Sequence, residues 1–488
     1  MLVNKAHQLN RAIPIANLNN CGIIEIDRKN YANMETKLDS ALRSPSHPND
    51  PNKPNWAKIS SKVVVQASLW ALAITLLQIA VACWLSGRSS LAKSYLTLFE
   101  WDSLWYANII NNGYFTTIPP DMSEWGKYSN VSFFPGYPAL AFLVQQILKL
   151  STEHSLLLTA QLAGWGFWTY LLLLFDRLQI PKQLVVGSIV AILVHPGSFY
   201  LVAAYSEPLF LVSLMGLIYW TDAPQKSAWV WAAISGFMMS ATRLVGLPLA
   251  LFPLIALINR PKPQWSLSGL RVWVKDNLKY FAIAAISMLG GLLFFVFCQW
   301  RFGYWDLYMQ STRNGWWVIP DYFVLSRPWF FQWMAKLFSR GLDPDLKLAE
   351  FGGLHFPYSD EFSRLTIPFS LGVFLICLLV EIAIATLKKD QTWKQRLGLY
   401  FCSWTIFYIS ATGMANRALG SMIRHSFPTY VLLVLAIAYL LTVIPFPQMF
   451  KQKRVTIPIA FLLILLSLLS LAVQGLLEHR FTHGLWVS

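Results

Sequence analysis

The chain has 488 residues, of which 55% are hydrophobic and only 13% are charged, and its mean hydropathy is +0.45. A soluble domain carries about 25% charged residues, so this composition excludes a soluble enzyme with a single anchor and indicates a polytopic membrane protein. The net charge of +15 does not indicate a nucleic-acid partner, because the basic residues form short clusters between apolar runs. The five cysteines are isolated and show neither metal-site nor disulfide spacing.

The N-terminal segment, residues 1–62, is polar, and we expect it to be a loosely ordered cytoplasmic tail. The first apolar run, Val63–Leu85, begins too late for a signal peptide. It is long enough to cross a bilayer and opens a membrane domain that covers residues 63–488. With the basic tail inside, the segment after this run falls on the outer face.

Further apolar runs are candidate spans: Ser155–Phe175, Leu184–Val194, Tyr205–Trp220, Ala228–Ala241, Leu244–Ile258, Tyr280–Trp300, Ile367–Leu387, Leu397–Thr412, Phe427–Ile444 and Val455–Leu477. Basic residues gather in connectors that we place in the cytoplasm: Asp176–Lys182, Arg260–Lys279, Lys388–Arg396 and Lys451–Arg454. These connectors all fall on the cytoplasmic side if Phe133–Leu150 is not a full span but lies in, or dips into, the outer leaflet. We therefore predict an all-α polytopic membrane protein with about eleven transmembrane helices, twelve or thirteen being the alternative. Its long outer loops are residues 86–154, which carry interfacial helices, and residues 301–366.

The first outer loop contains a carboxylate among aromatic residues, in the stretch Phe99–Tyr106 (FEWDSLWY). Aromatic walls exclude water and raise the basicity of a carboxylate, as a general base requires. We therefore predict that Asp102 takes a proton from a sugar or lipid hydroxyl, with Trp101, Trp105 and Tyr106 around it. The alternative is a plain loop carboxylate among residues of the interfacial aromatic belt.

Two polar residues stand at the ends of one hairpin between apolar runs. Glu207, which precedes Pro208, could cap a helix N-terminus. However, acidic residues at membrane depth usually face a cavity and mark function, so we predict that Glu207 binds substrate. His195 precedes Pro196 and either binds substrate or only ends a helix.

Cationic residues also interrupt or border the apolar runs. Arg243 divides Ala228–Ile258, and Arg424 and His425 stand just before Phe427. The planar guanidinium suits a lipid phosphate, and the alternative is snorkelling to an interface. We predict that Arg243 and Arg424 bind a phosphate.

Three further patterns are weaker. A second Trp-Asp pair, at Asp306, lacks the aromatic residues that follow Asp102, and we expect a loop residue. Clusters at Trp316–Trp317 and Trp329–Trp333 are typical of helices that lie in the interface. Asn130 begins an Asn-Val-Ser glycosylation sequon, which is a short and unspecific pattern.

Taken in order, these motifs resemble the integral-membrane glycosyltransferases of clan C, and more closely the phosphatidylinositol-glycan class V group of mannosyltransferases and its prokaryotic relatives. The similarity runs from about Phe99 to the end of the chain. It rests on Trp101-Asp102 with Trp105-Tyr106 and Gly113-Tyr114, Phe133-Phe134-Pro135 with Tyr137-Pro138, His195-Pro196-Gly197, Ala204-Tyr205-Ser206-Glu207, Ala241-Thr242-Arg243 with Gly246, Arg424 with Phe427-Pro428, and Gly484-Leu485-Trp486-Val487. The chain departs from the group at His195, where Asn is common, and in its polar N-terminal tail.

The resemblance implies that a hexose, usually mannose, passes with inversion from a polyprenyl-phosphate donor to a lipid-linked or glycan acceptor on the non-cytoplasmic face. It gives Asp102 the position of the catalytic carboxylate. We expect Arg243 and Arg424 to stabilise the departing phosphate, and Glu207 and His195 to orient hydroxyl groups. The chain shows no nucleotide-binding loop and no acidic cluster with metal spacing, so we expect neither cofactor nor metal. We expect a prokaryotic plasma membrane, or the endoplasmic reticulum in a eukaryote.

Three other functions stay open. A transporter or flippase of lipid-linked sugars would distribute polar residues through the membrane midplane, and the sequence shows no internal repeat to support one. A non-catalytic subunit of a glycan-assembly complex would tolerate the loss of Asp102. An oligosaccharide or protein transferase of the same clan should carry a large soluble outer domain.

Overall fold

The computed structural model describes residues 60–116, 129–259, 266–316, 318–326, 348–351, 354–357, 359–388, 393–415, 421–443, 453–485 and 487. All of them belong to one compact unit, Pro54–Ser488. The predicted cytoplasmic tail, residues 1–62, therefore lies almost entirely outside the described residues, as do Trp317 and the Trp329–Trp333 cluster.

The first half of the unit is helical. Its elements are α2 (Ser61–Leu85), α3 (Leu91–Leu96), α4 (Asp102–Asn112), α5 (Gly136–Leu148), α6 (Thr152–Arg177), α7 (Lys182–Leu193), the 3-10 helix η1 (Ser198–Leu201), α8 (Glu207–Thr221), α9 (Ala228–Thr242), α10 (Gly246–Leu249), α11 (Phe252–Ala256) and η2 (Leu257–Asn259).

The second half adds longer helices and one hairpin. Its elements are α12 (Leu267–Asp276), α13 (Leu278–Phe302), α14 (Leu307–Trp316), η3 (Val324–Ser326), β1 (Leu348–Phe351), β2 (Leu354–Pro357), α16 (Ser359–Lys388), α17 (Trp393–Met414), α18 (Met422–Val443) and α20 (Lys453–Thr482). The strands β1 and β2 pair antiparallel, with Leu348 opposite Pro357. The sequence analysis did not predict this hairpin within the outer loop 301–366.

A helix lies at each predicted apolar run, so the protein is helical and membrane-embedded, as predicted. Five helices of the described chain are long and apolar enough to cross a membrane: α2, α6, α13, α18 and the Phe461–Thr482 part of α20. Other apolar helices are shorter, among them α5, α7, α8 and α9. The count of about eleven spans stays a prediction.

Proline explains why one predicted span is broken. The run Leu244–Ile258 forms the short pieces α10, α11 and η2, with Pro248 in α10 and Pro253 at the start of α11. Proline lacks an N–H group and disfavours a helical conformation in the residue before it. The chain therefore turns soon after α9 instead of continuing as one straight helix.

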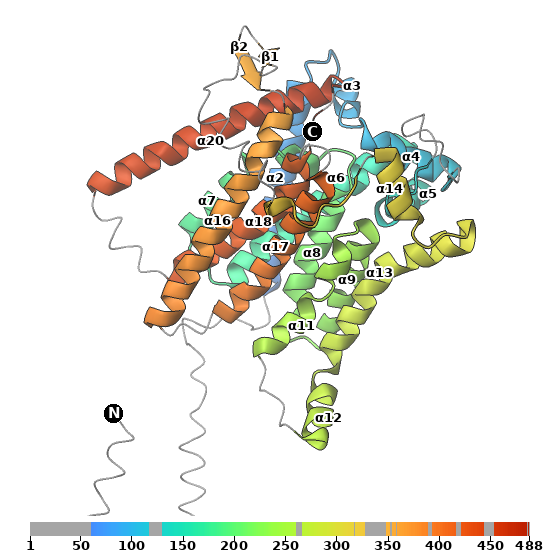
Figure 1. The fold of residues 1–488 in the computed structure, drawn as a ribbon. Helices are drawn as coiled ribbons and strands as arrows, with labels where there is room; N and C mark the ends of the chain where they lie inside the picture. Colours follow the sequence, from blue (N-terminus) through green and yellow to red (C-terminus); the bar gives the residue numbers. More distant parts are fainter. Residues whose placement is uncertain are drawn as a thin grey trace, which may run out of the picture. The chain divides into compact units, whose positions relative to one another are not determined.

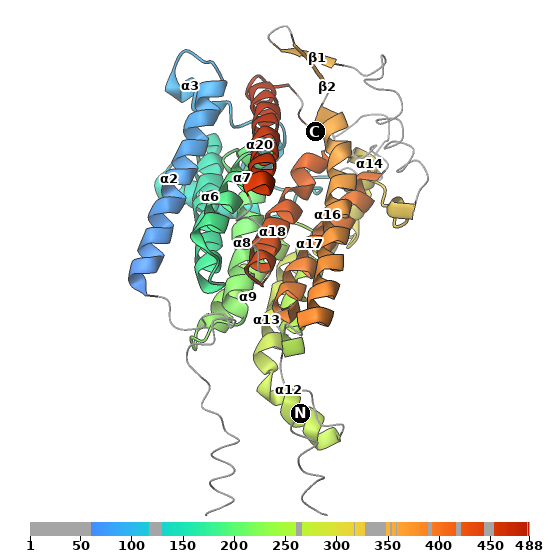
Figure 2. The same ribbon diagram turned by 90° about the vertical axis from the view of Figure 1, so that its left-hand side faces the viewer.

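The helices pack in two groups that face each other (Figure 1). In the first, α2 packs on α6, α6 on α8, α8 on α9 and α9 on α13. In the second, α18 packs on α7, α16 and α17. Figure 2 shows α2 and α6 on one side of the unit and α16, α17 and α18 on the other. The helix α11, which touches α13 and α17, joins the two groups.

Small residues allow α9 and α13 to approach closely. A Cβ atom at Gly290 would clash with the carbonyl oxygen of Phe237, and one at Gly236 would clash with the Ser287 side chain. The hydroxyl of Ser240 accepts from the Gly291 N–H group at 3.0 Å. Small residues and interhelical hydrogen bonds of this kind stabilise helix pairs in a bilayer, where lipid competes for apolar contacts.

A buried ion pair ties α16 to α17. The Arg396 side chain is fully buried and donates from Nε and Nη2 to the two oxygens of Glu381, at 2.5 and 2.7 Å. The hydroxyl of Tyr400 donates to the same carboxylate at 3.0 Å. Arg396, which the sequence analysis counted among the basic residues of a cytoplasmic connector, is thus a packing residue.

Candidate functional site

One end of the helical unit brings four charged side chains together from four helices. Asp102 is the first residue of α4, and Glu207 is the first residue of α8. Arg243 directly follows the last residue of α9, and Arg424 lies in the first turn of α18. Because the N-terminus of a helix carries a partial positive charge, both carboxylates stand where the backbone favours a negative group.

The charged side chains form one continuous network. Arg424 donates from Nη1 to Oδ2 of Asp102 at 2.5 Å and from Nε to Oε1 of Glu207. Arg243 donates from Nη1 to the same Oε1 at 2.7 Å. Its Nη2 donates to Nδ1 of His425 at 2.8 Å. Two carboxylates and two guanidinium groups therefore balance each other in charge, and Glu207 is the centre of the network.

Glu207 is the most deeply buried member. Its side chain is fully buried, whereas those of Asp102, Arg243 and Arg424 keep 13, 16 and 11% of their surface exposed. Its Oε1 accepts from both guanidinium groups, but its Oε2 accepts no hydrogen bond from the described residues. A buried carboxylate oxygen without a donor is costly. Oε2 of Glu207 is therefore an acceptor that no donor among the described residues uses.

Two tyrosine rings cover Arg424. The guanidinium carbon lies 4.4 Å from the ring centre of Tyr205 and 5.6 Å from that of Tyr200. Cation–π contacts of this kind stabilise a partly desolvated cation. Burial raises the pKa of Tyr200 well above that of a free tyrosine, so its hydroxyl stays neutral. The sequence analysis assigned neither ring a role, although both lie within eight residues of Glu207.

The residue before Asp102 has an unusual backbone. Trp101 has φ 55° and ψ −107°, in the region that favours glycine. Residues other than glycine persist there only when surrounding contacts hold them, often at functional sites. Trp101 packs against the cluster formed by Phe199, Phe481 and Val487, near the C-terminal end of the chain. This packing sets the direction in which α4, and with it Asp102, begins.

The other predicted aromatic residues of the motif form a neighbouring wall. The Trp105 ring stacks on Phe133 at a centroid distance of 5.9 Å, and the Tyr106 ring meets Phe133 and Tyr137 edge-on at 5.2 and 4.8 Å. Asp102, by contrast, points to Arg424. The sequence predicts rings around the carboxylate; the side-chain contact found for Asp102 is instead an ion pair with the guanidinium of Arg424, which sequence spacing alone could not place.

The two predicted histidines have different surroundings. His425 belongs to the network through Arg243. His195 lies between the rings of Phe427 and Tyr430, and its Nδ1 accepts from the Gly197 N–H group at 3.0 Å. Burial lowers the pKa of His195 to about 3, so the ring is neutral. These contacts match the alternative that His195 ends a helix and shapes the turn after it.

Two weaker motifs have structural partners. Asp306 immediately precedes α14, and its Oδ1 accepts from the side chain of Gln310 at 2.9 Å. Asn130 of the glycosylation sequon is fully buried and donates to Asn108 and to the Gly113 carbonyl, both at 2.9 Å. A buried amide with these partners is not available as a glycosylation acceptor in the folded chain.

Known protein families and curated proteins give no relative of the chain. No model of a known protein family matches it. No curated protein matches it either. In the described part of the chain, no three or more His, Cys, Asp and Glu side chains are grouped so that they could hold a metal ion. The function therefore rests on the chemistry of the network itself.

Proposed function

We propose that the chain is a membrane glycosyltransferase that passes a hexose, with mannose as the first candidate, from a polyprenyl-phosphate donor to a lipid-linked or glycan acceptor. The observation that carries the proposal is the network itself, in which Asp102 and Glu207 share Arg424 and Glu207 also holds Arg243. The network combines a carboxylate that can accept a proton with cations that can bind a phosphate, and both are partly exposed at one end of apolar helices.

The proposed reaction is a single displacement with inversion. The oxygen of the acceptor hydroxyl forms a bond to the anomeric carbon, and Asp102 accepts the proton that this hydroxyl loses. The bond from that carbon to the phosphate oxygen breaks, and the lipid phosphate leaves with the electron pair. Arg424 holds the carboxylate of Asp102 in one orientation, as a positioned base requires.

The leaving phosphate needs charge stabilisation rather than a proton. A guanidinium carries five N–H donors in one plane, and the contacts of Arg243 with Glu207 and His425 use only part of them. Arg243 and Arg424 can therefore hold the phosphate as negative charge develops on it. Glu207, whose Oε1 accepts from both guanidinium groups, would act as an orienting group. In this proposal the residues themselves carry the reaction, without a metal or cofactor.

The outer face is the proposed location. The basic connector between α11 and α13, which includes α12 with Arg271 and Lys275, lies at the far end of α13 from Arg301. Short basic connectors prefer the cytoplasm, so the opposite end, where α9 ends and α8 begins, belongs on the non-cytoplasmic side. The charged side chains gather at one end of the helices, which favours an enzyme over a transporter with polar groups at the midplane.

The direct test is to compare glycolipids and cell-surface glycans, by mass spectrometry, from cells with and without the protein. The purified full-length chain is then given synthetic polyprenyl-phosphate hexoses and the glycolipid that disappeared. Formation of the missing glycolipid supports the proposal. An unchanged glycan profile, or a changed profile in which the purified chain releases no polyprenyl phosphate, overturns it.

A further inference from the structure

The helix α12 projects beyond one end of the helix bundle, as Figures 1 and 2 both show. All ten of its residues are at least partly exposed. Among the described helices, α13 is the one that α12 contacts most. Leu267 keeps 90% of its surface exposed, and Leu270, Val272 and Val274 are exposed as well. Contiguous apolar surface of this kind marks contact with a membrane or with another molecule.

The junction with α13 places α12 at the surface of the bilayer. Only Asn277 separates α12 from α13, which is long and apolar enough to cross a membrane. Asn277 is buried, and its Nδ2 donates to the Trp273 carbonyl at 2.8 Å. The Tyr280 hydroxyl donates to Asp222 at 2.7 Å, which ties the start of α13 to the end of α8. Because α8 begins at Glu207, the charged network lies at the opposite end of the helices.

The two sides of α12 differ in chemistry. Leu267, Leu270 and Val274 recur at intervals of three and four residues, so they form one apolar stripe. Arg271 and Lys275 are four residues apart and form an exposed row beside this stripe. An apolar stripe bordered by cations is typical of helices that lie in the plane of a membrane interface.

The arrangement fits a lipid layer with negatively charged headgroups. The stripe suits acyl chains, and the cations are attracted to phosphate groups whose charge no choline balances. Lys279, in the first turn of α13, adds a third exposed cation, whereas Asp276 is the one acidic residue in the sequence of α12. We propose that α12 is a membrane-surface anchor that binds anionic phospholipids in the leaflet opposite the charged network. This binding does not depend on the proposed sugar transfer.

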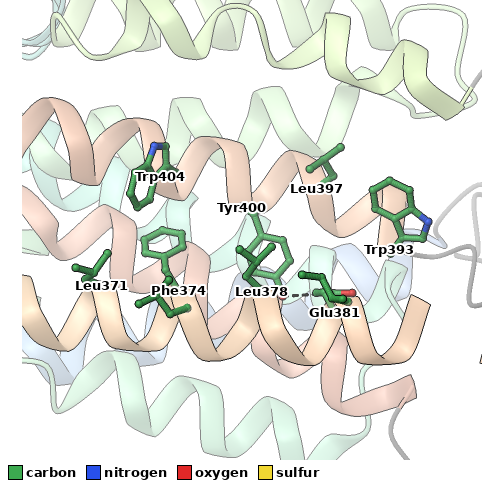
Figure 3. Close-up of a pocket in the computed structure, with 10 residues that line it drawn as sticks. Leu371, Phe374, Leu378, Glu381, Trp393, Leu397, Tyr400 and Trp404 are labelled. Carbon is green, nitrogen blue, oxygen red and sulfur yellow. Dashed lines mark hydrogen bonds between the residues drawn. The ribbon is translucent and has the colours of Figure 1, made fainter. Parts of the chain in front are cut away.

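A cavity between α16 and α17 provides an internal reference for lipid contact. Its volume is about 500 Å³, and its lining includes Leu375, Leu378 and Trp404 (Figure 3). Leu375 and Leu378 are more than half exposed, so lipid can reach the cavity. Among the described residues of the lining, Glu381 is the one charged group, and it is paired with Arg396. Anionic and zwitterionic lipids should therefore enter this cavity equally.

The test compares an anionic with a zwitterionic lipid probe. The purified full-length chain is placed in nanodiscs of phosphatidylcholine and phosphatidylglycerol in equal parts. It is photolabelled with either lipid carrying a diazirine near the glycerol end of one acyl chain, and mass spectrometry maps the adducts. We expect the ratio of phosphatidylglycerol to phosphatidylcholine adducts to be about ten-fold higher in α12 than in the cavity, since each basic side chain strengthens the attraction about five-fold. Equal ratios, or no lipid adducts in α12, overturn the inference.

Removing one cation tests whether α12 itself selects the lipid. We expect Lys275→Gln to lower the adduct ratio in α12 about five-fold. Lys226→Gln is the matched control, because Lys226 is also exposed and lies in the connector between α8 and α9, at the same end of the helices. This variant should keep the ratio of the natural chain. Equal losses in the two variants would show that the charge of the whole face, and not α12, attracts the lipid.

The apolar stripe is tested by one substitution on each side of the helix. Leu270→Ser removes an apolar side chain from the stripe, and Val272→Ser removes an exposed one from outside it. At an unchanged melting temperature, we expect Leu270→Ser to reduce the adducts of both lipids in α12 at least about three-fold, because an apolar side chain gains free energy by leaving water. Val272→Ser should leave them unchanged. An equal reduction in both variants contradicts an anchor that lies with one side in the membrane.

Discussion

Arg424 holds Asp102 by an ion pair, Nη1 to Oδ2 at 2.5 Å, although 322 residues separate them in the chain. Through Nε, the same guanidinium also reaches Glu207. Bonds in two directions from one planar group fix the relative positions of α4, α8 and α18. The site therefore depends on the packing of the helices as much as on the identity of its residues.

The first prediction concerns the proposed base. Asp102→Asn keeps the shape of the side chain but removes the group that accepts the proton. We expect the rate of transfer by the purified chain to fall at least about 100-fold, because general-base catalysis contributes about 10²–10⁴-fold. The measurement is release of polyprenyl phosphate from a synthetic donor.

Asp306→Asn is the matched control for this substitution. It changes the other Trp-Asp pair, which lies beside α14 and hydrogen-bonds Gln310. We expect near-normal transfer from this variant. Near-normal transfer from Asp102→Asn, with correct folding, would remove Asp102 from the mechanism.

The second prediction concerns the centre of the network. Glu207→Gln leaves two guanidinium groups against a neutral amide in a buried place. Breaking a buried ion pair by removing one partner costs about 3–5 kcal/mol, so we expect a clearly lower melting temperature as well as lost transfer. Asp176→Asn, at an exposed carboxylate in the last turn of α6, should leave both unchanged. A stable and active Glu207→Gln variant would show that the carboxylate is dispensable.

The sequence predicted well where the helices of the membrane domain lie, because a long run without charge can adopt few structures other than a helix in a bilayer. It also predicted Asp102, Glu207, Arg243 and Arg424 as candidates, since a charge at the edge of an apolar run needs an explanation. It could not predict which charges pair, because that depends on the order in which α4, α8, α9 and α18 pack.

Residues without a charge were harder to recognise. Tyr200 and Tyr205 cover Arg424, yet each is one aromatic residue among many in this chain. The role of Arg396 was also hidden, because a cation beside an apolar run looks like a loop residue until its partner Glu381 is placed. The hairpin of β1 and β2 was not predicted, because its strands are short and lie in a polar loop where the alternation of apolar and polar residues is weak.

The third prediction separates stability from activity. Glu381→Gln removes the carboxylate that accepts two bonds from Arg396 and one from Tyr400. We expect a loss of about 3–5 kcal/mol in stability and an unchanged KM for the donor, since this pair shares no residue with the network. Thermal unfolding in detergent and donor kinetics below the unfolding temperature check both. A higher KM with intact folding would instead connect the cavity between α16 and α17 to the donor.

The fourth prediction follows from the depressed pKa of His195. Its pKa is about 3 in the folded chain and about 6.5 in an unfolded one, so between these values only the unfolded state binds the proton. Stability from this residue is complete above pH 6.5 and is lost as the pH falls towards 3. At pH 5 the loss amounts to about 2 kcal/mol, from 1.36 kcal/mol per pH unit.

His195→Asn removes this titration and keeps an oxygen that can accept from the Gly197 N–H group. We therefore expect the melting temperature of the variant to fall less than that of the natural chain between pH 7.5 and pH 5. Identical pH dependence in the two proteins would show that His195 is hydrated or charged in the folded state.

The last prediction concerns the contact between α5 and the end of α9. Gly136→Ala adds a Cβ atom that would lie 2.8 Å from the backbone of Ala241 and from Oγ1 of Thr242, so one of the two helices must move. Because Arg243 follows directly, we expect the movement to displace its guanidinium and to reduce kcat about ten-fold or more, since small misplacements near a reacting centre have large effects.

Gly187→Ala is the control for a helical glycine, because a Cβ atom there meets nothing within 4 Å. Alanine favours a helix over glycine by about 0.5–1 kcal/mol, so this variant should be slightly more stable and fully active. If Gly136→Ala keeps full activity and a normal melting temperature, the helix contact tolerates movement, and the position of Arg243 must be fixed by Glu207 and His425 instead.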